Sequence, residues 1–181
     1  MRDLTAARSQ PAITPSRRVQ PLRPATRYTL RGAEAVRLAA GEALGVELPA
    51  LPCRAVTGGE RAALWLGPDE WLLLAPEAHA DALAAALAAG LRDLPHSLVD
   101  VSHRQVALEV SGSAAPALLS AGCPLDLDES TFPAGTCTRT MLAKAEIVLW
   151  RTGERVFRIE VWRSFAAYVS QFLAEAARGM S

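Results

Sequence analysis

The clearest structural signal in the sequence is Ala62-Ala-Leu-Trp-Leu-Gly-Pro-Asp-Glu-Trp-Leu-Leu-Leu-Ala75, which contains two apolar runs. They are joined by Gly67-Pro68-Asp69, a combination that supplies the backbone conformations of a tight turn. Short apolar runs bounded by turn residues predict strands, so this stretch predicts an antiparallel hairpin. A sheet with a buried face is therefore expected in the first half of the chain.

Helices are predicted on both sides of this hairpin. Residues 77–91 follow it with an acidic first turn and many Ala and Leu residues, which favours a helix. Residues 27–31 alternate apolar and polar side chains like a strand, and residues 33–44 have the spacing of an amphipathic helix that Gly45 ends. The order of elements indicates an α+β protein. Further strands are expected at 97–101, 105–111, 136–142, 147–152 and 156–162, and further helices at 113–121 and 165–177.

A similar order of elements occurs twice. Leu30-Arg-Gly-Ala-Glu-Ala35 parallels Val110-Ser-Gly-Ser-Ala-Ala115, because each is a strand end followed by Gly and the start of a helix. In both parts of the chain a Trp-bearing hairpin and a final helix come next. This favours two similar β-α-β-β-α halves, 27–99 and 100–178, with antiparallel sheets and helices packed on one side. Chance similarity of ordinary strand–helix segments is the alternative.

Composition narrows the class of protein. The chain has 181 residues with 19 Lys and Arg against 19 Asp and Glu, so a strongly basic nucleic-acid binder is not expected. The longest apolar run, residues 82–91, is too short to span a bilayer. The Met1 end lacks the apolar segment of a secretory signal, and the three cysteines form no Cys-x-x-Cys pair. We expect a reduced, cytoplasmic protein with no disulfide framework, no zinc finger and no membrane span.

The N-terminal end differs in composition from the rest of the chain. Residues 1–27 carry six Arg and four Pro but only one acidic residue, and they have few large apolar side chains. We expect residues 1–26 to form a basic, Pro-rich arm that is disordered or bound along an acidic groove of a partner. A mitochondrial presequence is a third interpretation, although the prolines oppose the amphipathic helix that a presequence requires.

Few residues carry a signature of catalysis or cofactor binding. The Gly-rich nucleotide motifs are missing, and the three histidines lack the spacing of metal ligands. Asp100, Ser102 and His103 combine the side chains of a catalytic triad, but strand alternation places His103 on the opposite face from the other two. Cys123 and Cys137 are expected to be small buried hydrophobic residues. We therefore predict no catalytic, cofactor-binding or metal-binding residue in this chain.

Three motifs resemble known families. Asp100-Val-Ser-His-Arg-Gln-Val-Ala-Leu-Glu-Val-Ser-Gly112 resembles a motif of the glycine-cleavage aminomethyltransferases, which bind folate. The sequence more closely resembles the gamma subunit of heterotetrameric sarcosine oxidase. Two motifs carry this resemblance: Leu64-Trp-Leu-Gly-Pro-Asp-Glu-Trp-Leu-Leu73 and Phe157-Arg-Ile-Glu-Val-Trp-Arg-Ser-Phe-Ala166. It covers about residues 27–178 and implies halves of the ferredoxin-like or aminomethyltransferase folate-binding type.

The resemblance to the gamma subunit implies membership of an enzyme complex. The family's holoenzyme oxidises sarcosine to glycine, producing hydrogen peroxide and, with tetrahydrofolate, methylenetetrahydrofolate. By this resemblance FAD, FMN, NAD and tetrahydrofolate are bound in partner subunits. The chain itself is then a noncatalytic structural subunit that contacts the alpha subunit directly, with beta and delta subunits in the same complex.

Two other functions remain open. A freestanding folate-binding aminomethyltransferase-like enzyme would use Glu146, which lies one step from the position where those enzymes place a catalytic aspartate. Its weakness is that the chain supplies only about half of that family's usual length. A binder of nucleic acid or of an anionic surface would act through the basic arm, which lacks an aromatic platform for reading bases.

The residues of most interest are therefore candidates for a partner interface. Trp162, Arg163 and Phe165 lie where the last strand meets the last helix, and Trp150 lies in the strand before; aromatic and Arg side chains are the usual anchors of interfaces. Core packing of the tryptophans is the alternative. Because Arg163 opposes the helix dipole, we expect it to face a carboxylate of its own chain or of a partner. Two further arginines are expected at solvated strand positions: Arg139 and Arg151.

Overall fold

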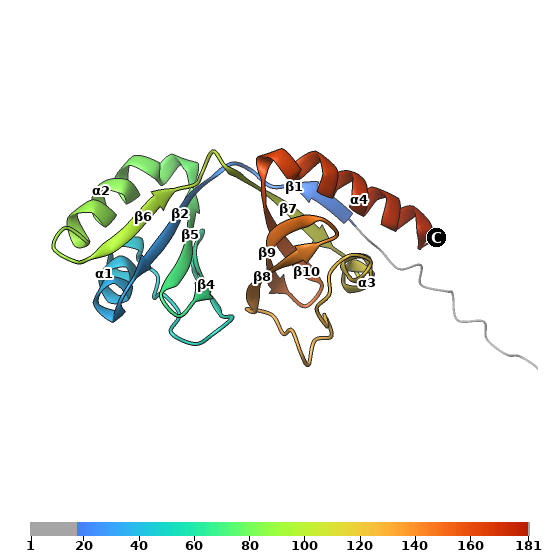
Figure 1. The fold of residues 1–181 in the computed structure, drawn as a ribbon, viewed down its shortest axis with the longest axis horizontal. Coiled ribbons are helices and arrows are strands. Elements are labelled where there is room, and N and C mark those ends of the chain that lie inside the picture. The colour runs from blue at the N-terminus through green and yellow to red at the C-terminus, as the bar shows by residue number, and fades with distance from the viewer. Residues whose placement is uncertain (1–17, 181) are drawn as a thin grey trace, which may run out of the picture.

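The computed structural model describes residues 18–180 and contains two five-stranded antiparallel sheets (Figure 1). Helices cover the outer face of each sheet, and the inner faces of the two sheets look toward each other across the middle of the molecule. The predicted α+β class with antiparallel sheets and helices on one side of each is confirmed.

The first sheet has the strand order β3-β4-β5-β2-β6. Helices α1 (Glu34–Leu44) and α2 (Ala80–Gly90) cover its outer face, and α2 follows a single 3-10 turn. Gly45 ends α1 at φ +72°, a backbone conformation that glycine adopts without strain. The predicted hairpin is β4 and β5. The strands are β2 (Ala25–Gly32), β3 (Ala55–Gly58), β4 (Arg61–Gly67), β5 (Glu70–Pro76) and β6 (His96–Asp100).

The second sheet has the order β1-β7-β10-β9-β8. Its outer face is covered by α3 (Ala115–Ser120) and α4 (Ala166–Gly179), and α4 follows a 3-10 turn at Arg163–Phe165. The elements follow one another in the same order in both sheets: β2, α1, β3, β4, β5 and α2 in the first correspond to β7, α3, β8, β9, β10 and α4 in the second. The strands are β1 (Arg18–Pro21), β7 (Gln105–Ser111), β8 (Cys137–Leu142), β9 (Ala145–Gly153) and β10 (Val156–Trp162).

The two sheets exchange their edge strands. β1 comes just before β2 in the chain but pairs with β7 of the second sheet, where Val19 lies opposite Val110. β6 comes just before β7 but pairs with β2 of the first sheet, where Val99 lies opposite Thr29. Each sheet is thus completed by a strand that leads into the other sheet, and the chain crosses between them twice (Figure 1).

This exchange corrects the expectation for the N-terminal arm. Residues 18–21 belong to a sheet, so the prediction that all of residues 1–26 are disordered or bound to a partner is wrong for this part. Residues 22–26 are described as well, with β2 beginning at Ala25, whereas residues 1–17 lie outside the described residues. The division into halves at 27–99 and 100–178 stays an interpretation; the chain passes from the first sheet to the second between β6 and β7.

Each sheet is buried on both faces, which explains the continuous apolar runs of the hairpin. Leu73 and Trp71 of β5 point outward and pack with α1 and α2, whereas Leu72 and Leu74 point inward. The inward residues form a third cluster with side chains of the second sheet, among them Val148. A strand covered on both faces requires apolar residues at successive positions rather than at alternate ones.

Most predicted elements agree with the structure to within a few residues, but two short strands were missed: β1 and β3. Both are edge strands of four residues, and neither has a long apolar run. No helix within residues 18–180 has the length and apolarity needed to cross a membrane.

Candidate functional site: the cleft between the sheets

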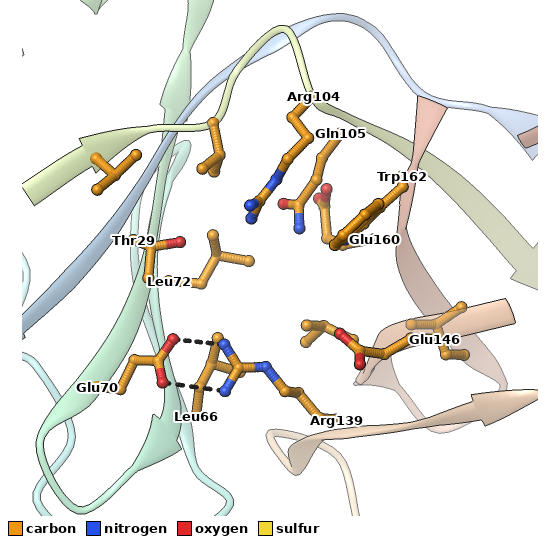
Figure 2. Close-up of a pocket in the computed structure, with 14 residues that line it drawn as sticks. Thr29, Leu66, Glu70, Leu72, Arg104, Gln105, Arg139, Glu146, Glu160 and Trp162 are labelled. Atoms are coloured by element: carbon orange, nitrogen blue, oxygen red, sulfur yellow. Dashed lines mark hydrogen bonds and ion pairs between the residues drawn. The ribbon is translucent and has the colours of Figure 1, made fainter. Parts of the chain in front are cut away.

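The inner faces of the sheets touch at the third hydrophobic cluster, and beside it they leave a cleft of about 400 Å³ (Figure 2). Thr29, Glu70 and Leu72 line one wall from the first sheet. Glu146 and Trp162 line the other wall from the second sheet. The cleft combines an apolar floor with several charged side chains, so it is the candidate functional site.

A buried ion pair joins the two sheets beside the cleft. Arg27 of β2 donates from Nε to Glu160 Oε2 of β10 at 2.6 Å, and the two side chains are only 2% and 1% exposed. Arg158 donates to the other carboxylate oxygen, Oε1, at 2.8 Å. Both oxygens of Glu160 are therefore occupied by guanidinium groups, which offsets the cost of burying its charge. This carboxylate holds the sheets together.

A second ion pair crosses between the sheets in a more exposed place. Both terminal nitrogens of Arg139 in β8 bind the carboxylate of Glu70 in β5, and the Nη1 to Oε2 distance is 3.0 Å (Figure 2). The hydrogen bonds from Arg139 hold the pKa of Glu70 below its usual range. Arg139 is 41% exposed at its side chain, so its expected solvated position is confirmed, but it also has a specific partner.

The residues that suggest a catalytic triad form a turn. The backbone N–H of Ser102 donates to Asp100 Oδ1 at 2.8 Å, and Ser102 Oγ accepts the backbone N–H of Arg27 at 2.9 Å. The imidazole of His103 forms no hydrogen bond within residues 18–180, and its side chain is exposed. Asp100 and Ser102 thus fix the crossover from β6 to β7 against β2.

Arg104 and Gln105 lie at the mouth of the cleft and were not predicted as site residues. The guanidinium of Arg104 lies 5.2 Å from the ring centroid of Trp162 and forms no ion pair in the described part of the chain. Gln105 is 8% exposed, and its Oε1 atom is buried without a hydrogen-bond partner. Both side chains extend into the space beside Trp162 (Figure 2).

The four predicted interface residues lie in different environments. Trp162 is 43% exposed and Phe165 is 40% exposed. Arg163 donates from Nε to the carbonyl oxygen of His103 at 3.0 Å, so its partner within the chain is a backbone carbonyl and not the expected carboxylate. Trp150 is 8% exposed and packs in the cluster between the sheets. The first three therefore remain at the surface, whereas Trp150 is in the core of this chain.

The prediction that Arg151 is solvated is wrong. Arg151 is 3% exposed, and it donates to the carbonyl oxygens of Phe132 and Glu154 at 2.8 and 3.0 Å. Its guanidinium also lies 5.1 Å from the ring centroid of Phe157. Arg151 thereby joins the turn between β9 and β10 to the segment before β8.

The expectation for the two cysteines is confirmed. Cys123 is 6% exposed and Cys137 is fully buried, and both pack in hydrophobic clusters. Burial raises the pKa of Cys137 to about 12, so its thiol stays protonated at neutral pH. Within residues 18–180 no group of His, Cys, Asp and Glu side chains has the arrangement of a metal site.

Comparison with known proteins identifies the family. Residues 31–179 match the family model described as "Sarcosine oxidase, gamma subunit family". The chain belongs to this family. Two curated members, both named sarcosine oxidase subunit gamma, are similar to it. The one from Corynebacterium sp. (strain P-1) is 40% identical over 141 residues, 76% of this chain and 68% of the relative. The one from Arthrobacter sp is 38% identical over 135 residues, 74% and 66% respectively.

Solved structures agree with this family membership. The chain superposes with a TM-score of 0.86 and 33% identity on a chain of the heterotetrameric sarcosine oxidase from Corynebacterium sp. U-96, covering 91% of this chain and 85% of that one. The aminomethyltransferase T of the glycine cleavage system from Bartonella henselae has a TM-score of 0.67 at 17% identity, over 87% of this chain and 45% of the other. The second likeness shows a shared fold. The matches to the two curated gamma subunits span about two thirds of their lengths.

Proposed function

We propose that this chain is a noncatalytic structural subunit of a heterotetrameric sarcosine oxidase and that it contacts the alpha subunit directly. The observation that carries the proposal is the superposition on a chain of such an enzyme over 91% of this chain. In the proposed complex the beta and delta subunits complete the assembly. FAD, FMN, NAD and tetrahydrofolate are then held by the partner subunits, and the complex oxidises sarcosine.

The charged groups of the cleft support a structural role. Glu160 is held by Arg27 and Arg158, and Glu70 is held by Arg139, so both carboxylates serve as ties between the sheets. A general acid or base must instead be free to exchange a proton with a substrate. Glu146, the residue that a freestanding aminomethyltransferase-like enzyme would use, lies exposed on the wall of the cleft.

The junction of β10 and α4 supports a partner contact. Trp162, Phe165 and Tyr168 are exposed by 43%, 40% and 37%, although aromatic side chains of this size are normally buried. Arg163 lies among them, and an exposed group of aromatic residues with an arginine is typical of interface anchors. We propose this surface as the contact with the alpha subunit. A cytoplasmic location is proposed as well, and the three free cysteines are compatible with it.

The proposal is tested by purifying the complex through this chain. An affinity tag on the full-length chain in its native cells should recover larger subunits, a flavin absorption spectrum and hydrogen peroxide production that depends on sarcosine. Recovery of a colourless chain of 19.3 kDa without partners would contradict the proposal. Tetrahydrofolate binding by that isolated chain, lost in Glu146→Gln, would support the aminomethyltransferase-like alternative.

A further inference from the structure

We infer that Cys53 and Cys137 form a reversible disulfide bond when the protein meets a hydroperoxide, and that this bond joins the first sheet to the second. Cys53 lies in the turn just before β3, and Cys137 is the first residue of β8. Both are free thiols in this structure. Together they form a site of oxidative modification at the place where the edges of the two sheets meet.

The backbone places the two cysteines opposite each other. Arg54 and Thr136 form an isolated antiparallel bridge, so residues 53 and 137 are the next pair along it. The backbone N–H of Cys137 donates to the carbonyl oxygen of Cys53 at 2.9 Å, which agrees with this register. Opposite residues of antiparallel strands have Cα atoms roughly 4.5–5.5 Å apart, and disulfides span Cα separations of roughly 4.4–6.8 Å. The backbone separation therefore suits a disulfide.

The thiol of Cys137 is held against the segment that contains Cys53. It donates to the carbonyl oxygens of Arg54 and Trp65, with Sγ to oxygen distances of 3.3 and 3.5 Å. Burial, and after it the neighbouring thiol of Cys53, raises the pKa of Cys137 to about 12. Because the thiolate is the form that reacts with peroxide, Cys137 does not react with the oxidant directly.

Cys53 is the thiol that an oxidant reaches first. Its side chain is partly exposed, whereas Cys137 is fully buried. The backbone of Cys53 has φ +58°, in the left-handed region that residues other than glycine rarely adopt. Backbone strain of this kind is concentrated at functional positions. Cys53 therefore reacts with the oxidant, and Cys137 reacts with the oxidised Cys53.

The reaction has two steps and consumes one hydrogen peroxide. The thiolate of Cys53 attacks one peroxide oxygen and the O–O bond breaks. Hydroxide leaves with the proton that Cys53 lost, and Cys53 becomes a sulfenic acid. The sulfur of Cys137 then attacks the sulfur of the sulfenic acid. The S–S bond forms, the S–O bond breaks, and the leaving hydroxide takes the proton of Cys137.

Two thiols are thus oxidised to one disulfide, and one peroxide is reduced to two waters. A complex that oxidises sarcosine, as proposed above, would release this oxidant beside the chain. The inference does not depend on that complex, because the test below supplies hydrogen peroxide directly.

The test uses the full-length chain, first reduced and then treated with hydrogen peroxide in the absence of denaturant. The number of thiols should fall from three to one, and dithiothreitol should restore all three. After alkylation of free thiols, non-reducing tryptic mapping should find residues 38–54 joined to residues 105–139. The second peptide also contains Cys123, so the mapping is repeated with Cys123→Ala, in which the same link should form. Three remaining thiols, or loss of the link in Cys123→Ala, would overturn the inference.

Matched variants separate the two steps. In Cys137→Ala, oxidation of Cys53 should stop at the sulfenic acid, which dimedone traps as an adduct on residues 38–54. In Cys53→Ala, Cys137 should stay unmodified at the same peroxide concentration, because its buried thiol stays protonated. Failure to trap Cys53 in the first variant, or oxidation of Cys137 in the second, would overturn the inference.

Urea denaturation shows whether the native structure accommodates the bond. The oxidised wild-type protein should unfold at a urea concentration about 1 M higher than the reduced protein, because the disulfide closes a long loop in the unfolded chain. A midpoint that does not rise would show that the bond distorts the pairing at Arg54 and Thr136, and it would contradict the inference.

Discussion

Two ion pairs join the same two sheets, and they differ mainly in burial. Arg27 and Glu160 are 2% and 1% exposed, whereas the side chains of Arg139 and Glu70 are 41% and 14% exposed. The buried pair is shielded from water, whereas the exposed pair is screened by it. Two contacts of the same chemistry are therefore expected to contribute differently to stability, and the buried pair should contribute more.

The largest effect is expected from breaking the buried pair. Glu160→Gln leaves Arg27 buried without a counter-charge, which should lower the free energy of unfolding by about 3–5 kcal/mol. Urea denaturation measures this change. The triple variant Arg27→Met, Arg158→Met and Glu160→Leu should recover much of the loss, because it removes Glu160 together with both arginines that bind it. A loss below about 1 kcal/mol for Glu160→Gln would show that burial does not set the importance of this pair.

A smaller effect is expected at the turn that supports the buried pair. Ser102→Ala removes the acceptor of the backbone N–H of Arg27, which should lower the free energy of unfolding by about 1–2 kcal/mol. If Ser102→Ala is fully neutral in urea denaturation, the crossover does not depend on this hydrogen bond.

The exposed pair should contribute less, and its contribution should depend on pH. Glu70→Gln is expected to lower the free energy of unfolding by about 0.5–1 kcal/mol at pH 7, since solvent screens the pair. The pKa of Glu70 is lowered in the folded state, so the stabilisation is complete above its unfolded pKa of about 4.3 and is lost as pH falls through its folded pKa. Denaturation of both proteins between pH 7 and pH 2 should show the difference shrinking toward acid. A difference that stays constant over this range would mean that ionisation of Glu70 does not contribute.

The smallest effect on stability is expected at the surface proposed to contact the alpha subunit. Phe165→Ser should change the free energy of unfolding by less than about 0.5 kcal/mol, because the side chain is exposed. It should nevertheless reduce recovery of partner subunits through a tagged chain. Leu38→Ser, at a residue 52% exposed on α1, is the matched control and should recover partners normally. Equal recovery with both variants would place the contact elsewhere.

Local patterns in the sequence predicted the hairpin, the four helices and most strands, because each depends on neighbouring residues. The pairing of Arg27 with Glu160 joins residues 133 positions apart, and neither residue carries a local signal of it. The exchanged strand β1 was missed for the same reason, since its partner β7 begins more than 80 residues later. Arg151 was misplaced because it shares the face of β9 that carries Ile147 and Leu149, and this face is covered by the core of the second sheet.

The candidate site was only partly predictable. Trp162 was predicted as a candidate interface residue, and the structure places it at the cleft, but Arg104 and Gln105 were missed. One signal was available: the crossover Val101-Ser-His-Arg-Gln105 ends in two residues able to bind a ligand, directly before an apolar strand. Arg104 has no carboxylate partner in the described chain, because the carboxylates near it bind arginines that come from both sheets. This arrangement could be seen only in the folded structure.

Native mass spectrometry of the gently purified protein tests the proposed assembly most directly. We expect one copy of the 19.3 kDa chain in a heterotetramer with three other subunits. The preparation should also produce peroxide from sarcosine. Detection of only the free chain or of a homo-oligomer at native protein levels would contradict a role as a subunit of a sarcosine oxidase.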